Sequence, residues 1–167
     1  ALVGRNISYS FSRRYFAEKF AKEQITDCEY INFDIPYIEE LPALIAATPT
    51  LAGMNVTIPY KEAVLPLLDL QSEALMAIKA CNTIKILPSG KLKGDNTDYI
   101  GFRDSLIPYL QPHHNRALIL GTGGASKAVA FALSQLGIPF LLVSRESSAI
   151  AISYDELTKE IIENHSL

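Results

Sequence analysis

Apolar residues along the chain follow two patterns, short dense or alternating runs typical of strands and longer stretches with helical spacing. The hydrophobic runs predict strands at 1–4, 29–35, 51–58, 82–87, 92–96, 116–121 and 139–144. The runs "NTIKIL" and "LKGDN" flank the turn "PSGK", so they are expected to form a hairpin.

Helical periodicity fills most of the intervals between these strands. Behind Ser12, which stands where an N-cap residue is expected, the apolar residues Tyr15, Phe16 and Phe20 recur at helical spacing. Further helices are predicted at 38–47, 60–70, 73–80, 97–110, 125–136 and 154–164, and a serine-rich loop is expected ahead of the last one. This alternation predicts an α/β protein with an open, mostly parallel sheet.

The polar, proline-bearing stretch "QPHHN" at 111–115 reads as a linker, after which a new strand begins. We therefore predict a substrate-binding catalytic domain over residues 1–104 and a Rossmann-type nucleotide-binding domain over residues 105–167. Two α/β domains of ordinary size need about 200 residues or more, so the second domain is expected to be incomplete. Its exposed sheet edge would be covered by a partner or by a second copy, as in a possible homodimer.

Composition narrows the classes of function. The 167 residues are 49% hydrophobic with a net charge of −3, and acidic and basic residues are interspersed, which does not favour a nucleic-acid partner. The two cysteines, Cys28 and Cys81, lack metal-ligand spacing, so we expect no metal site and a reducing compartment. The apolar runs are too short for a membrane span, and a cytoplasmic location is expected.

The segment "LILGTGGAS" predicts a strand that turns tightly into a helix. Glycines at 121, 123 and 124 would let backbone N–H groups approach a pyrophosphate at the helix N-terminus. The sixth position of the fingerprint carries Ser126 instead of glycine or alanine. A strand-to-helix turn without a ligand is the alternative interpretation.

The next strand ends in "LVSRESS", which places Arg145 where NAD-binding domains usually carry an acidic residue. Arginine at this place accommodates the 2′-phosphate of NADP, so NADP is the expected cofactor. Glu146 lies beside it and weakens this preference, and Arg145 could also be a solvated loop residue.

The strand in "GMNVTIPYK" stops at Pro59 and presents Lys61 at the start of a helix. Alone, such a lysine is usually a solvated surface residue. The segments "ACNTI" and "GDNTD" place further polar side chains at or near strand ends, where they could meet Thr57 and Lys61 in one crevice. A lysine beside an aspartate in a crevice suits proton transfer.

Four blocks together resemble the shikimate dehydrogenase family: "SYSFS", "GMNVTIPYK", "ACNTI" with "GDNTDYIGF", and "GTGGASKAV". Members of this family use NADP to interconvert shikimate and 3-dehydroshikimate in aromatic amino-acid biosynthesis. The resemblance implies that Lys61 and Asp98 form the catalytic pair. The substrate-binding residues that it implies are Ser10, Ser12, Thr57 and Asn82, and the cofactor-binding residues are Gly121, Gly123, Gly124, Ala125, Ser144 and Arg145.

The sequence departs from the family pattern around the two serines, where Tyr9 and Arg13 replace the usual histidine and proline. These changes leave the substrate preference open, and a relative that acts on quinate is one alternative. The other alternative is a non-catalytic binding module, in which Lys61 and Asp98 form a structural ion pair.

Overall fold

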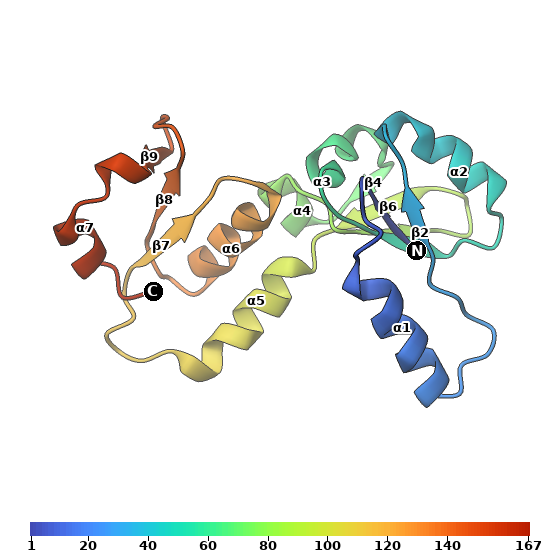
Figure 1. Ribbon diagram of the computed structural model, residues 1–167, viewed down its shortest axis with the longest axis horizontal. Helices are drawn as coiled ribbons and strands as arrows, with labels where there is room; N and C mark the ends of the chain where they lie inside the picture. Colours follow the sequence, from blue (N-terminus) through green and yellow to red (C-terminus); the bar gives the residue numbers. More distant parts are fainter. The chain divides into compact units, whose positions relative to one another are not determined.

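The computed structural model describes residues 1–167, which form two compact units (Figure 1). The first unit consists of Ala1–Met76 and Cys81–Asp95, and the second of Ala77–Ala80 and Asn96–Leu167. Each unit contains its own sheet and its own hydrophobic core. The predicted α/β class with a mostly parallel sheet is confirmed.

The first unit is built on a six-stranded sheet with the order β2-β1-β3-β5-β6-β4. Its strands are β1 (Leu2–Gly4), β2 (Asn32–Asp34), β3 (Gly53–Val56), β4 (Leu70–Gln71), β5 (Thr83–Ile86) and β6 (Leu92–Asp95). Its helices are α1 (Phe11–Lys22), η1 (Ile38–Glu40), α2 (Leu41–Ala47), α3 (Tyr60–Ala63) and η2 (Leu65–Leu67), and α4 (Glu73–Ile78) begins in it. β1 pairs parallel with β2 and β3, whereas β5 runs antiparallel to β3 and β6, which confirms the predicted hairpin.

The prediction of one continuous helix over 60–70 is wrong. α3 ends at Ala63 and is followed by the 3₁₀ turn η2, in which Pro66 lacks the N–H that a continuing helix needs. The end of the predicted helix instead forms β4, which pairs parallel with β6. Tertiary pairing therefore overrides the helical periodicity of this segment.

Alternate residues of the strands point into the hydrophobic core of the first unit. In β3, Met54 and Val56 are buried in the hydrophobic cluster, and the alternate residue Asn55 is only partly buried. Ile84 of β5 is 1% exposed and belongs to the same cluster. Gly53 is required at the start of β3, because a Cβ there would lie 2.6 Å from the Ile84 carbonyl oxygen.

The second unit contains a parallel three-stranded sheet with the order β7-β8-β9. Its elements are α5 (Asp98–Leu106), η3 (Ile107–Tyr109), β7 (Ala117–Leu120), α6 (Gly124–Gln135), β8 (Phe140–Ser144), β9 (Ala151–Ser153), η4 (Tyr154–Glu156) and α7 (Lys159–Glu163). The serine-rich loop predicted before residue 154 is partly wrong, since its last residues form β9. The helix predicted over 154–164 is likewise divided into η4 and α7.

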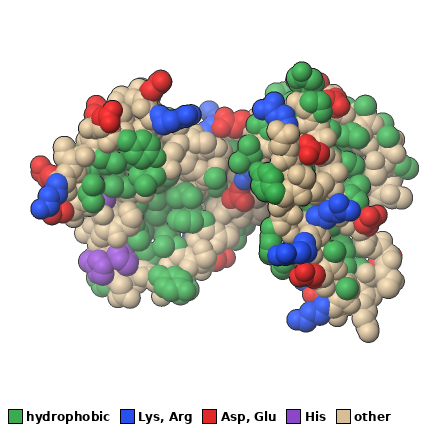
Figure 2. Space-filling model, viewed as in Figure 1, with side chains coloured by type: hydrophobic (Ala, Val, Ile, Leu, Met, Phe, Trp, Pro, Cys, Tyr) green, Lys and Arg blue, Asp and Glu red, His purple; other side chains and the backbone are tan.

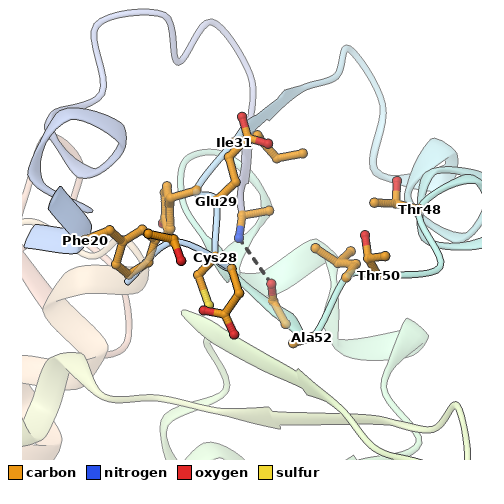
Figure 3. Close-up of a pocket in the computed structure, with 13 residues that line it drawn as sticks. Phe20, Cys28, Glu29, Ile31, Thr48, Thr50 and Ala52 are labelled. Atoms are coloured by element: carbon orange, nitrogen blue, oxygen red, sulfur yellow. Dashed lines mark hydrogen bonds between the residues drawn. The ribbon is translucent and has the colours of Figure 1, made fainter. Parts of the chain in front are cut away.

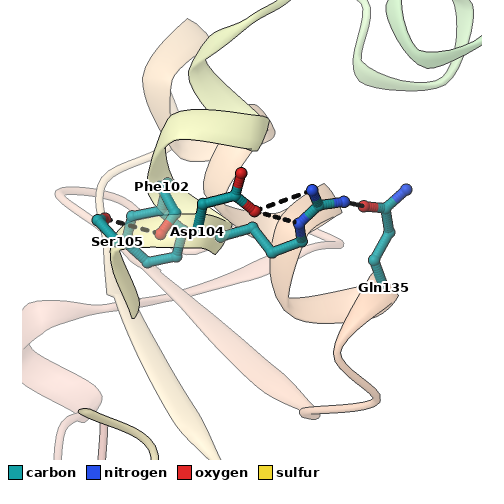
Figure 4. Close-up of polar contacts among 5 residues, drawn as sticks. Phe102, Asp104, Ser105 and Gln135 are labelled. Carbon is teal, nitrogen blue, oxygen red and sulfur yellow. Dashed lines mark hydrogen bonds and ion pairs between the residues drawn. The ribbon is translucent and has the colours of Figure 1, made fainter. Parts of the chain in front are cut away.

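α5 packs on α6 and thus belongs to the second unit. Phe102 and Leu106 contact the apolar cluster of this unit. Arg103 Nη1 donates to Gln135 Oε1 at 3.3 Å, and Arg103 Nε donates to Asp104 Oδ1 at 2.9 Å (Figure 4). The buried members of the cluster are Ala117, Ile119, Leu133 and Ile138. The compact units consequently divide at 95/96, earlier than the domain boundary predicted at 104/105.

Acidic and basic side chains are interspersed on the face of the molecule drawn in Figure 2. None of the helices has the length and apolar character that crossing a bilayer requires. No group of three or more His, Cys, Asp or Glu side chains is arranged to hold a metal ion.

Candidate functional site

One edge of the six-stranded sheet collects the polar residues predicted from the first unit. Because of the strand directions, the carboxyl ends of β1 and β3 lie at the same edge as the amino end of β5. Thr57 directly follows β3 and Asn82 directly precedes β5, and the Val56 N–H donates to the Asn82 carbonyl at 2.8 Å. The Lys61 carbonyl accepts from Cys81 N at 2.7 Å. The structure therefore brings Thr57, Lys61 and Asn82 to one place.

The turn that presents Lys61 is fixed on both sides. The Thr57 N–H donates to Val3 O at 2.9 Å, and the Thr57 carbonyl accepts from Tyr60 N at 2.9 Å. Tyr60 is buried, and its hydroxyl donates to Ile35 O at 2.8 Å. Burial raises the pKa of Tyr60, so this hydroxyl remains a neutral donor. Lys61 follows this anchor and is half-buried at the start of α3.

Asn82 is 7% exposed and is held by a chain of hydrogen bonds. The Thr83 hydroxyl donates to Asn82 Oδ1 at 2.9 Å, and Asn55 Nδ2 lies 3.4 Å from both Thr83 Oγ1 and Asn82 O. The Tyr30 hydroxyl donates to Asn55 Oδ1 at 2.8 Å, and its ring stacks on Phe16. Asn55 and Tyr30 are positioning residues that sequence reasoning missed. The signal for Asn55 was an amide within an otherwise apolar strand.

Ser10 is the N-cap of α1, so the prediction that Ser12 caps this helix is wrong. Ser10 Oγ accepts from Ser12 N at 3.2 Å, and the helix begins at Phe11. A tight turn ahead of the helix, in which Ser10 N donates to Ile7 O at 2.9 Å, sets this start. The Ser12 hydroxyl is thus not required for capping.

The loop before Ser10 is held by Asp34 at the end of β2, a residue that sequence reasoning also missed. Its carboxylate accepts from Asn6 N at 2.8 Å and from Ile7 N at 3.1 Å. Burial raises the pKa of Tyr30, and a hydrogen bond with the Ser12 side chain opposes this rise. The two serines are therefore tied to β2 and to the network around Asn82.

Asp98 is the first residue of α5 and belongs to the second unit, whereas Lys61 belongs to the first. Its helix start is organised by Asn96, whose side-chain carbonyl accepts from Asp98 N at 3.0 Å and from Tyr99 N at 3.3 Å. Asn96 is fully buried, and its Nδ2 donates to Ala80 O at 2.6 Å. The signal for this role was an asparagine just ahead of a predicted helix.

In the second unit, a cavity of about 430 Å³ is lined by Gly121, Thr122, Gly123, Ser144, Arg145 and Tyr154. Four predicted cofactor residues therefore meet in one cavity. Gly123 is the N-cap of α6, which begins with the predicted residues Gly124 and Ala125. Tyr154 is a wall residue that sequence reasoning missed.

The geometry of this glycine turn fits a nucleotide pyrophosphate. Gly121 has a φ of 122°, which favours glycine, and a Cβ at Gly121 or Gly123 would project into open space instead of protein atoms. The turn leads into the N-terminus of the twelve-residue helix α6, where N–H groups and the helix dipole favour an anion. The strand ahead of the turn, β7, is held by its pairing with β8. It is also held by the Leu118 N–H, which donates to Leu167 O at 2.9 Å.

A larger hollow, of about 610 Å³, lies elsewhere in the first unit, at the amino ends of β1 and β3 (Figure 3). Phe20, Cys28 and Thr50 are among its lining residues, and none of the predicted site residues lines it. The Ala1 ammonium donates to Gly53 O at 3.2 Å there. Thr57 and Lys61 lie at the opposite edge of the sheet, so this hollow is not the candidate site.

A sheet with a polar edge and a separate βαβ unit with a glycine turn define the class of two-domain α/β proteins that combine a substrate domain with a Rossmann-type nucleotide-binding domain. Residues 2–84 match the family described as "Shikimate dehydrogenase substrate binding domain". The NADP-dependent shikimate dehydrogenase of Caldicellulosiruptor bescii is 32% identical over 165 residues, which are 96% of this chain and 57% of that protein.

Solved structures agree with this match. The shikimate 5-dehydrogenase of Thermus thermophilus, in complex with NADP(H) and shikimate, has a TM-score of 0.77 and 34% identity over 87% of this chain and 55% of that chain. The quinate dehydrogenase of Corynebacterium glutamicum, in complex with NAD, has a TM-score of 0.75 and 28% identity, covering 87% of this chain and 54% of that one. The chain belongs to the shikimate dehydrogenase family. It spans about half the length of the curated relatives that it matches.

Proposed function

We propose that the chain provides the substrate site and part of the nucleotide site of an NADP-dependent shikimate dehydrogenase, which reversibly oxidises shikimate to 3-dehydroshikimate. The observation that carries this proposal is the gathering of Thr57, Lys61 and Asn82 at one sheet edge in a member of this family. Such an edge is where open α/β sheets bind their ligands.

In this proposal, Thr57 and Asn82 hydrogen-bond the ring hydroxyls of shikimate, while Ser10 and Ser12 bind its carboxylate. The Asn82 amide suits this role because its neighbours already fix its orientation. The cap of α1 uses Ser10, so the Ser12 hydroxyl would only have to exchange its hydrogen bond with Tyr30 for one with the carboxylate.

Lys61 and Asp98 would act as the proton-transfer pair. During oxidation the proton of the reacting hydroxyl passes to this pair, and in the reverse direction the pair returns it to the carbonyl oxygen. Bound NADP supplies the nicotinamide that accepts the hydride. Asp98 is held at the start of α5 by Asn96, which limits the conformations of its backbone.

Gly121, Gly123, Gly124 and Ala125 would bind the pyrophosphate of NADP, and Ser144 and Arg145 its 2′-phosphate. Arg145 is exposed at the end of β8, so its guanidinium is available for a bidentate contact with a phosphate. We further propose that the protein acts in the cytoplasm and forms a homodimer.

The test compares turnover and binding. We expect the 167-residue chain to bind shikimate in calorimetry and to form reduced NADP slowly, since it spans only part of its relatives' length. Lys61→Ala should lower the rate by about 10²-fold or more, the usual contribution of a proton-transfer group. Lys91→Ala, in the exposed hairpin turn, is the matched control.

Equal rates for the two variants would refute the role of Lys61. The absence of any heat with shikimate would favour the non-catalytic module. The structural similarity to a quinate dehydrogenase makes quinate the second candidate substrate. Turnover measured on both acids under the same conditions decides between them.

A further inference from the structure

The connection between β8 and β9 is unusually short for parallel neighbours. β8 ends at Ser144 and β9 begins at Ala151, and the two strands pair in parallel from Leu142 with Ala151 to Ser144 with Ser153. Such pairs ordinarily need a crossover of about a dozen residues, usually a helix. Here residues 145–150 make the connection without one, and we call them the strap.

The strap is closed by a carboxylate from η4. Glu156 Oε2 accepts a hydrogen bond from Ser153 N at 2.6 Å and another from the Ser147 hydroxyl. The strap is also tied to the start of β9, where the Ser148 N–H donates to Ala151 O at 2.8 Å. The hydrogen bonds from Ser147 and Ser153 lower the pKa of Glu156, so the carboxylate is ionised when it makes them.

The residues at the start of the strap and at the start of η4 line the nucleotide cavity. Arg145 is the first residue of the strap, and Tyr154 is the first residue of η4, and both line the cavity together with the glycine turn. Tyr154 is the aromatic residue in a wall made otherwise of small, polar and basic residues. Tyr154 is 45% exposed, so its aromatic side chain is accessible to a planar base.

We propose that Glu156 is a positioning residue for cofactor specificity: by closing the strap it holds Arg145 for the 2′-phosphate of NADP, while Tyr154 packs against the adenine. This inference rests on the proposed function, in which this cavity binds NADP. An arginine on an ordered loop loses less conformational entropy on binding than one on a free loop.

If Glu156 acted only through its charge, its removal would have the opposite effect on phosphate binding from the one that a positioning role predicts. A carboxylate near the cavity repels a phosphate, so removal of its charge should strengthen binding if Glu156 has no positioning role. Loss of the strap's closure should weaken binding instead. The sign of the change therefore distinguishes the two explanations.

The experiment is calorimetric titration of the 167-residue chain with adenosine 2′,5′-bisphosphate and with adenosine 5′-monophosphate, which differ only in the 2′-phosphate. Glu156→Gln should weaken binding of the bisphosphate by about fivefold to tenfold and leave the monophosphate nearly unchanged. Asp155→Asn, which removes the neighbouring charge of η4 but none of the strap contacts, is the control. Ser147→Ala removes one strap contact without a change of charge and should have a smaller effect in the same direction.

Tyr154→Ala should weaken both ligands by about tenfold, and Tyr154→Phe should leave them unchanged. Equal or tighter binding of the bisphosphate by Glu156→Gln and Ser147→Ala would overturn the inference. The proposed function would survive that result if Arg145→Ala still abolished the preference for the bisphosphate. Failure of the unchanged chain to bind either nucleotide would overturn both.

Discussion

Replacement of Asn96 by alanine should remove three hydrogen bonds from the interior of the second unit. The side chain is fully buried, its Nδ2 donates to Ala80 O at 2.6 Å, and its Oδ1 accepts from the first two N–H groups of α5, at Asp98 and Tyr99. Alanine can replace none of these contacts. The change also leaves a small cavity beside Ala80.

The expected loss follows from two contributions. Removal of a capping acceptor costs about 1 kcal/mol. The Ala80 carbonyl would lose a short hydrogen bond, and a buried group without its partner costs about 1–3 kcal/mol. The free energy of unfolding should therefore fall by about 2–4 kcal/mol, a large part of the roughly 5–15 kcal/mol that stabilises an ordinary domain.

Urea titration followed by far-ultraviolet circular dichroism would measure this loss, because the chain contains no tryptophan. Asn115→Ala, at an exposed position at the end of the linker, is the control and should change the free energy by less than about 0.5 kcal/mol. A loss for Asn96→Ala no larger than that of the control would refute the reasoning.

Three further substitutions test other parts of the fold. Gly53→Ala should destabilise the chain by about 2 kcal/mol or more, because its Cβ would meet the backbone oxygen of Ile84 at 2.6 Å; a loss below about 0.5 kcal/mol in urea would contradict the β3–β5 packing. Gly101→Ala, in α5 with open space around its Cβ, should instead stabilise by about 0.5–1 kcal/mol in the same assay, and a loss would count against this environment. Tyr60→Phe should cost about 1 kcal/mol at neutral pH, because Ile35 O loses its donor. Since burial raises the pKa of Tyr60, the stability that its hydroxyl contributes is present below the ordinary pKa of about 10 and is lost as the pH rises through the raised value. The Tyr60→Phe variant should therefore lose less stability in alkali than the unchanged chain. Parallel curves of stability against alkaline pH would contradict this.

The local patterns of the sequence were sufficient for much of the fold. The apolar runs located β1, β3, β7 and β8, and the turn between two alternating segments located the hairpin of β5 and β6. The residue types of the site, a lysine, an aspartate, two serines and a glycine turn, were also visible. These features depend on neighbours in the chain, which the sequence displays directly.

Tertiary structure decided the rest, because its contacts join residues far apart in sequence. Leu70, the last residue of a predicted helix, lies instead in β4 and pairs with β6. The end of the serine-rich stretch becomes β9 because β8 offers it hydrogen bonds. The sequence equally could not reveal that Tyr30 and Asn55 fix Asn82, or that Glu156 closes the strap. The sequence by itself determined which chemical groups the protein has and near which strand ends they lie. Only the folded chain decided which of them meet, since strand pairing and burial depend on distant partners.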